Sequence, residues 1–100
     1  MLIRGTTPTI RYTFKTVDPA EITAAYLTLK FSGGQIEKDL TAATVGTKYL
    51  EWQLTQTETL ALKAVKNVEI QLRYKTTGGD AYATPITLET AARILKDGEI

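Results

Sequence analysis

The sequence predicts an all-β fold, an immunoglobulin-like antiparallel β-sandwich of about seven strands with one or two short helical turns. Several segments alternate apolar and polar residues with a period of two, which is typical of strands with one face on a core. Turn-forming residues separate these segments, and signs of helix are few. With 100 residues, 43% of them hydrophobic, the chain has room for one domain over residues 1–100.

The first half of the chain predicts one edge strand followed by a hairpin. Pro8 lies at the start of the first strand and fits an edge position, because proline cannot donate to a strand ladder. Asp18 and Pro19 predict a single helical turn, with Asp18 as its cap. Gly33 and Gly34 can take positive φ and predict a hairpin turn. The strands expected here are residues 9–16, 25–31 and 35–40, with Ile10, Tyr12, Phe14, Ala25, Leu27, Leu29 and Phe31 facing the core.

The second half predicts a short helix between two strands and then a second hairpin. Thr55 and Glu58 have the spacing of a capping box at the start of that helix. Trp52, on the strand before it, is expected to anchor the core. Pro85 indicates an edge position or a bulge in the returning strand. The strands expected here are residues 49–55, 68–75 and 82–88, the last with Tyr82, Thr84, Ile86 and Leu88 in one row. Residues 90–95 fit the period of a helical turn as well as that of a strand, and we expect a strand.

The composition removes most routes to catalysis. The chain has no histidine and no cysteine, and its one serine, Ser32, falls in a predicted hairpin turn. The carboxylates of the predicted strands fall on outward faces, away from any cleft that would shift a pKa. We therefore expect no enzyme activity, no catalytic residue, no cofactor and no bound metal.

Charge and hydropathy also limit the partners. A net charge of +1, with both signs spread along the chain, provides no basic patch for a nucleic acid. No apolar run approaches the roughly 20 residues needed to span a membrane, and the first residues do not have the pattern of a signal peptide. We therefore expect no nucleic-acid partner and no membrane partner.

Four segments, residues 3–9, 54–60, 68–74 and 93–100, together resemble a family of small structural proteins of tailed phages and prophages of Gram-positive bacteria. In arrangement the chain is also similar to the immunoglobulin-like N-terminal domain of phage baseplate upper proteins. The resemblance implies a structural or assembly role in the virion, in the tail or baseplate, with assembly in the host cytoplasm. It implies other phage structural proteins as partners, and a homo-oligomer as a further possibility.

Such a protein would act through its sheet edges and terminal arms. Residues 1–7 could add to the sheet of another subunit or pair within their own sandwich, and both alternatives stay open. Residues 93–100 are a second candidate arm, with a frayed tail as the alternative. The candidate interface residues are Leu2, Ile3, Arg4, Thr6, Thr7, Tyr26, Tyr49, Arg93, Ile94 and Ile100.

Two other functions stay open at this stage. The chain could be a small phage-encoded binding module that acts inside the cell by occluding a host protein, although it lacks the strong acidic surface common among inhibitors of nucleic-acid enzymes. Carbohydrate binding would require Tyr26, Tyr49 or Trp52 to cluster on one open face.

Overall fold

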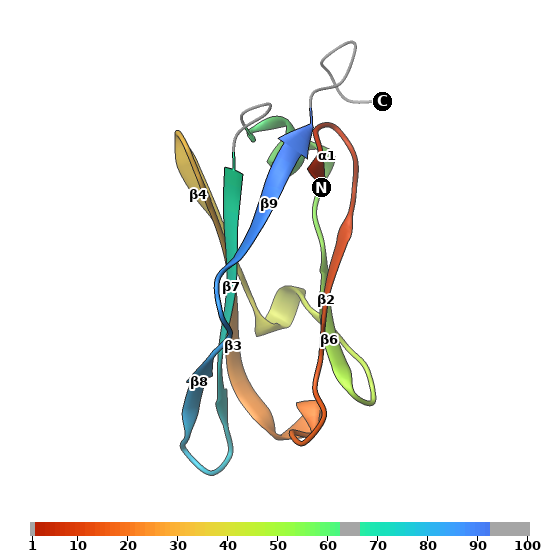
Figure 1. Cartoon of the computed structure of the whole chain (residues 1–100). Coiled ribbons are helices and arrows are strands. Elements are labelled where there is room, and N and C mark those ends of the chain that lie inside the picture. Colours follow the sequence, from red (N-terminus) through yellow and green to blue (C-terminus); the bar gives the residue numbers. More distant parts are fainter. Residues whose placement is uncertain (1, 63–66, 93–100) are drawn as a thin grey trace.

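Two β-sheets pack face to face in the computed structural model, which describes residues 2–62 and 67–92 (Figure 1). The strands are β1 (Leu2–Ile3), β2 (Thr9–Thr13), β3 (Ile22–Phe31), β4 (Gly34–Asp39), β5 (Thr44–Val45), β6 (Tyr49–Gln53), β7 (Asn67–Thr76), β8 (Ala81–Ala83) and β9 (Thr87–Ala92). The helical elements are helix α1 (Gln56–Leu60) and two 3-10 turns, Pro19–Glu21 and Leu40–Ala42.

The two sheets confirm the predicted all-β sandwich. The larger sheet has the order β1-β9-β7-β3-β4, with β8 also paired to β7, and the smaller has the order β2-β6-β5. The chain crosses between the sheets after β1, β2, β4 and β6, so each sheet combines strands from distant parts of the sequence. One feature departs from the prediction of an antiparallel fold: β1 runs parallel to β9, with Leu2 opposite Ala91.

The core lies between the two sheets and is built from the alternating rows that the sequence predicts. Trp52 is fully buried, and its indole Nε1 donates a hydrogen bond of 2.9 Å to the main-chain oxygen of Asp39. The predicted role of Trp52 as a core anchor is therefore confirmed. The other side chains with no exposed surface include Leu27, Leu29, Leu50, Leu54, Val68 and Leu72.

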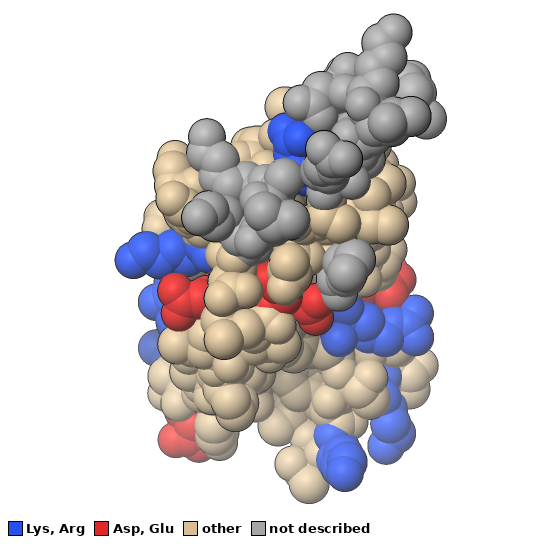
Figure 2. Space-filling view, turned by 45° about the horizontal axis from the view of Figure 1, so that its top comes forward, with Lys and Arg blue, Asp and Glu red and all other residues tan. Residues whose placement is uncertain are grey.

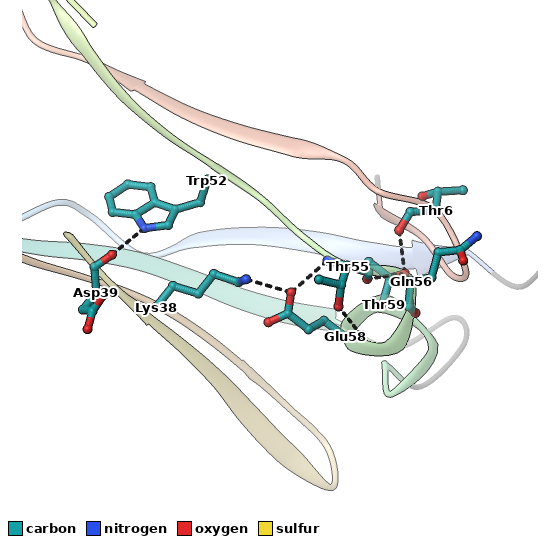
Figure 3. A network of polar contacts seen from close by, with 8 residues as sticks. All are labelled: Thr6, Lys38, Asp39, Trp52, Thr55, Gln56, Glu58 and Thr59. Carbon is teal, nitrogen blue, oxygen red and sulfur yellow. Dashed lines mark hydrogen bonds and ion pairs between the residues drawn. The ribbon is translucent and has the colours of Figure 1, made fainter. Parts of the chain in front are cut away.

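Helix α1 fastens the crossing between the sheets to two other elements (Figure 3). The predicted capping box is present: Glu58 N donates to the Thr55 hydroxyl at 3.1 Å, and Thr55 N donates to the Glu58 carboxylate at 2.8 Å. The buried Thr59 hydroxyl donates to the main-chain oxygen of Thr6 at 2.8 Å. Lys38 of β4 forms an ion pair of 2.8 Å with Glu58. The helix thus holds both the start of the chain and the edge strand β4.

The single row predicted for Tyr82, Thr84, Ile86 and Leu88 is wrong, because a bulge at Pro85 divides it. Ala83 of β8 lies opposite Arg73, whereas Thr87 of β9 lies opposite Ile70, so the returning chain contains one residue more than β7. An extra residue moves all later side chains to the opposite face. Leu88 is therefore 61% exposed, and Ala91 enters the core in its place.

The other differences concern two short strands that were not predicted, β1 and β5, the ends of elements, and the exposure of Tyr82. The predicted strand over residues 9–16 ends at Thr13. Tyr82 lies opposite Tyr74 and stacks on its ring, with the centroids 5.2 Å apart, but it is exposed and not part of the core. Of the predicted strand over residues 90–95, the first three residues belong to β9. The remainder of that segment lies outside the described residues.

Candidate functional site

The first residues of the chain lie in the sheet of their own chain, which is the second of the two alternatives that the sequence left open. Leu2 and Ile3 pair with β9, and the Leu2 side chain is only 6% exposed. The Arg4 guanidinium donates to the main-chain oxygens of Leu60 and Leu62, both at 2.8 Å. This segment is therefore part of the folded domain.

Thr6 and Thr7 continue this attachment to the fold. Besides accepting from Thr59, Thr6 donates through its hydroxyl to the main-chain oxygen of Ile3 at 2.6 Å. The main-chain oxygen of Thr7 accepts from the Gln53 side chain at 3.3 Å. Leu2, Ile3, Arg4, Thr6 and Thr7 are thus brought together by the structure, but as one side of the sandwich and not as a projecting arm.

The two tyrosines that the sequence singled out, Tyr26 and Tyr49, are not brought together. Tyr26 lies on β3 of the larger sheet, beneath the guanidinium of Arg73 at 5.7 Å, and Tyr49 lies on β6 of the smaller sheet, beneath that of Arg11 at 3.9 Å. Trp52 is buried. No open face carries all three, so the condition for carbohydrate binding is not met. Arg93, Ile94 and Ile100 lie outside the described residues.

A groove opens between β2 and β9, which lie on the same side of the sandwich (Figure 1). Its volume is about 340 Å³. Its walls come from both sheets, so the side chains at its floor lie at the edge of the hydrophobic core. The lining residues are Leu2, Pro8, Thr9, Ile10, Arg11, Tyr12, Ile70, Thr87 and Glu89.

The β2 wall of this groove presents unpaired main-chain groups. Phe14 N donates to Lys48 O at 2.8 Å, and Leu54 N donates to Pro8 O at 2.9 Å. Because hydrogen-bonded and non-hydrogen-bonded positions alternate along an antiparallel pair, the even-numbered residues of β2 bond to β6. The odd-numbered ones, Thr9, Arg11 and Thr13, direct their N–H and C=O groups to the open side, where the described residues offer no main-chain partner.

The β9 wall is open over most of its length as well. Residues 87–90 pair with β7 on one side, and among the described residues β1 covers the other side only at Ala91 and Ala92. The other edges of the two sheets are protected or short. On the edge strand β4, the mostly buried Lys38 side chain points toward the core side, and an inward-pointing charge is a common protection against pairing with another strand. Strand β5 has two residues, which is short for pairing with another chain. Within the part of the chain that the structure describes, both walls of the groove therefore carry strand main chain that is unpaired on the side facing the groove.

The electrostatics of the groove differ between its interior and its rim. Burial raises the pKa of the Tyr12 phenol above its ordinary value, and a hydrogen bond with the Thr84 side chain opposes that shift. Tyr12 therefore stays neutral inside the groove. On the outer side of β2, Arg11 pairs with Glu51 at 2.8 Å. Over the face shown in Figure 2, basic and acidic side chains lie next to one another across the middle.

Sequence reasoning missed the groove although it identified some of its residues. Ile10 and Tyr12 were expected to be core residues. Both are half-buried, because they lie on β2, the edge strand of the smaller sheet, and no further strand covers them on that side among the described residues. The available signals were the two prolines, since Pro8 and Pro85 both indicated an edge. Alternation alone does not say that two such edges lie side by side.

The described residues show no group of histidine, cysteine and carboxylate side chains that could hold a metal ion. Within the same residues, no helix has the length and apolar character needed to cross a membrane. No family model matches the chain, and neither the curated proteins nor the solved structures include a significant match to it. The phage family that the sequence resembles therefore stays a prediction.

Proposed function

We propose that this chain is a non-catalytic structural protein of a tailed phage or prophage particle, associated with the tail or baseplate, and that it binds its neighbours by β-strand addition. The observation that carries the proposal is the groove between two unpaired strand edges. Extended segments bind such edges because main-chain hydrogen bonds provide affinity and alternate side chains enter the pockets beside them.

The proposal changes which part of the chain makes the contact. Leu2 is buried and Arg4 is bonded to the end of helix α1, so the first residues are committed to their own domain. The contact surface is instead the odd-numbered main chain of β2 together with residues 87–90 of β9. The phage assignment rests on the sequence resemblance, and the absence of histidine and cysteine from the sequence agrees with a role that needs no catalytic group.

Mass spectrometry of gradient-purified particles tests this function. We expect the chain at a fixed ratio to the major tail protein in particles from the encoding phage or an induced lysogen. A chain that is abundant in the infected cell and absent from particles would overturn the structural role and favour the intracellular binding module. Particles from a host with the gene deleted provide the control for carry-over.

A further inference from the structure

We propose that the open edge of β2 binds an extended segment of a different protein in which apolar residues alternate with acidic ones. This inference rests on the proposed function and adds the chemistry of the partner to it. The main chain of the edge, the apolar floor of the groove and the charge on the outer side of β2 each determine one part of that chemistry.

The main chain determines that the partner segment is extended. Thr9, Arg11 and Thr13 present open N–H and C=O groups at every second residue, which only another strand can match in spacing. Strand β2 has five residues, so a segment of similar length would pair along all of it.

The groove determines that every second residue of the partner is apolar. The side chains of a strand added beside β2 would alternate between the two faces of the smaller sheet. Those on the inner face would enter the groove over Ile10, Tyr12 and Ile70, which are apolar or neutral. The carboxylate in the described lining is Glu89, on the β9 wall.

The outer side of β2 determines the charge of the intervening residues. The Arg11 side chain is 52% exposed although it pairs with Glu51. Beyond the end of β2, Lys15 and Lys48 line a shallow pocket together with a single carboxylate, Asp18. Among the residues that the structure describes, the outer side of β2 and the region beyond its end thus contain three basic side chains, Arg11, Lys15 and Lys48, and two carboxylates, Glu51 and Asp18. A carboxylate on the outer face of an added strand would lie across from Arg11, where opposite charges stabilise strand pairing.

The same charges disfavour a second copy of this chain as the occupant. Two β2 edges paired with one another would place Arg11 and Lys15 of both copies along one seam. Like charges opposite one another on paired strands are destabilising. A different protein with acidic residues fits the edge better than self-association does.

Two blocked eight-residue peptides test the inference, one alternating valine with glutamate and the other alternating valine with lysine. Binding to the full chain is measured by NMR titration of the main-chain amides. We expect the glutamate peptide to shift the amides of Thr9, Arg11 and Thr13 and to bind about 3- to 10-fold more tightly than the lysine peptide. Added salt should reduce that difference.

A pair of variants at one position separates strand addition from other contacts. Thr13→Pro removes an N–H that has no partner in the fold and should abolish binding of the glutamate peptide. Thr13→Val keeps the N–H and the branched shape and should leave binding unchanged. Circular dichroism of both variants checks that the sandwich stays folded.

Each outcome decides a separate question. Equal binding of both peptides would overturn the acidic partner, and shifts confined to another surface, or no binding by either peptide, would overturn the site. Any of these results can occur while the chain is a stoichiometric component of particles, which leaves the proposed function intact. Conversely, edge binding of the glutamate peptide by a chain absent from particles would support the inference and refute the virion role.

Discussion

Truncation of Trp52 tests whether the core is centred where the two sheets meet. The side chain has no exposed surface and donates one hydrogen bond to Asp39 O. Replacing a buried tryptophan by alanine leaves a cavity and costs about 3–5 kcal/mol. A domain of this length has a stability of roughly 5–15 kcal/mol. Trp52→Ala is therefore expected to remove a large fraction of the free energy of unfolding.

Chemical denaturation followed by far-ultraviolet circular dichroism measures this loss without relying on tryptophan fluorescence. Trp52→Phe keeps most of the ring and should cost less than the alanine variant, because it loses the indole hydrogen bond, worth about 1 kcal/mol, and a smaller volume. Tyr26→Ala serves as the control, since Tyr26 is 44% exposed and its truncation should change stability only slightly. A cost below about 1 kcal/mol for Trp52→Ala would refute the placement of this side chain in the core.

Three further predictions follow from other parts of the fold. Leu2→Ala should cost about 2–3 kcal/mol in the same unfolding assay, because Leu2 is a core residue, and an unchanged stability would mean that β1 is not attached. Gly46→Ala should lower the midpoint of thermal unfolding, because a Cβ at Gly46 would lie 2.2 Å from the Tyr49 ring, and an unaltered midpoint would contradict that packing. Burial by itself would raise the pKa of Glu58, but the ion pair with Lys38 and the capping bonds outweigh burial and lower that pKa. The ionised Glu58 carboxylate therefore stabilises the fold above the ordinary carboxyl pKa of about 4.3. This stabilisation is lost as the pH falls through the lower pKa of the folded state. The difference in unfolding free energy between the wild type and Glu58→Gln should therefore shrink below about pH 4, and a constant difference would count against this linkage.

The features that the sequence predicted correctly depend on residues close together in the chain. The capping box of Thr55 and Glu58 needs a spacing of three residues, and the hairpin at Gly33 needs a glycine with positive φ, which the structure shows at 102°. The burial of Trp52 follows from period-two alternation within one strand. In each case the local pattern and the final packing favour the same structure.

The features that the sequence did not predict depend on residues far apart in the chain. Pairing of Leu2 with Ala91 joins the two ends of the described chain, and no local pattern specifies it. The face occupied by Leu88 depends on one extra residue at Pro85, because a single insertion reverses the alternation. The groove requires knowledge of which strands are at the edges of the two sheets. That knowledge comes from strand order, which alternation does not contain.

The parallel pairing of β1 with β9 determines how this domain would respond to tension between its two ends. Force applied at Leu2 and Ala92 would pull two parallel neighbours in opposite directions, so their hydrogen bonds would be loaded in shear. The pairing extends over two residues on each strand, so we expect it to yield before the long β3–β7 pairing does. Single-molecule pulling should then register a small low-force step ahead of the main unfolding event, and Leu2→Ala should remove it. Tension would in this way uncover the rest of the β9 edge while leaving most of the sandwich intact.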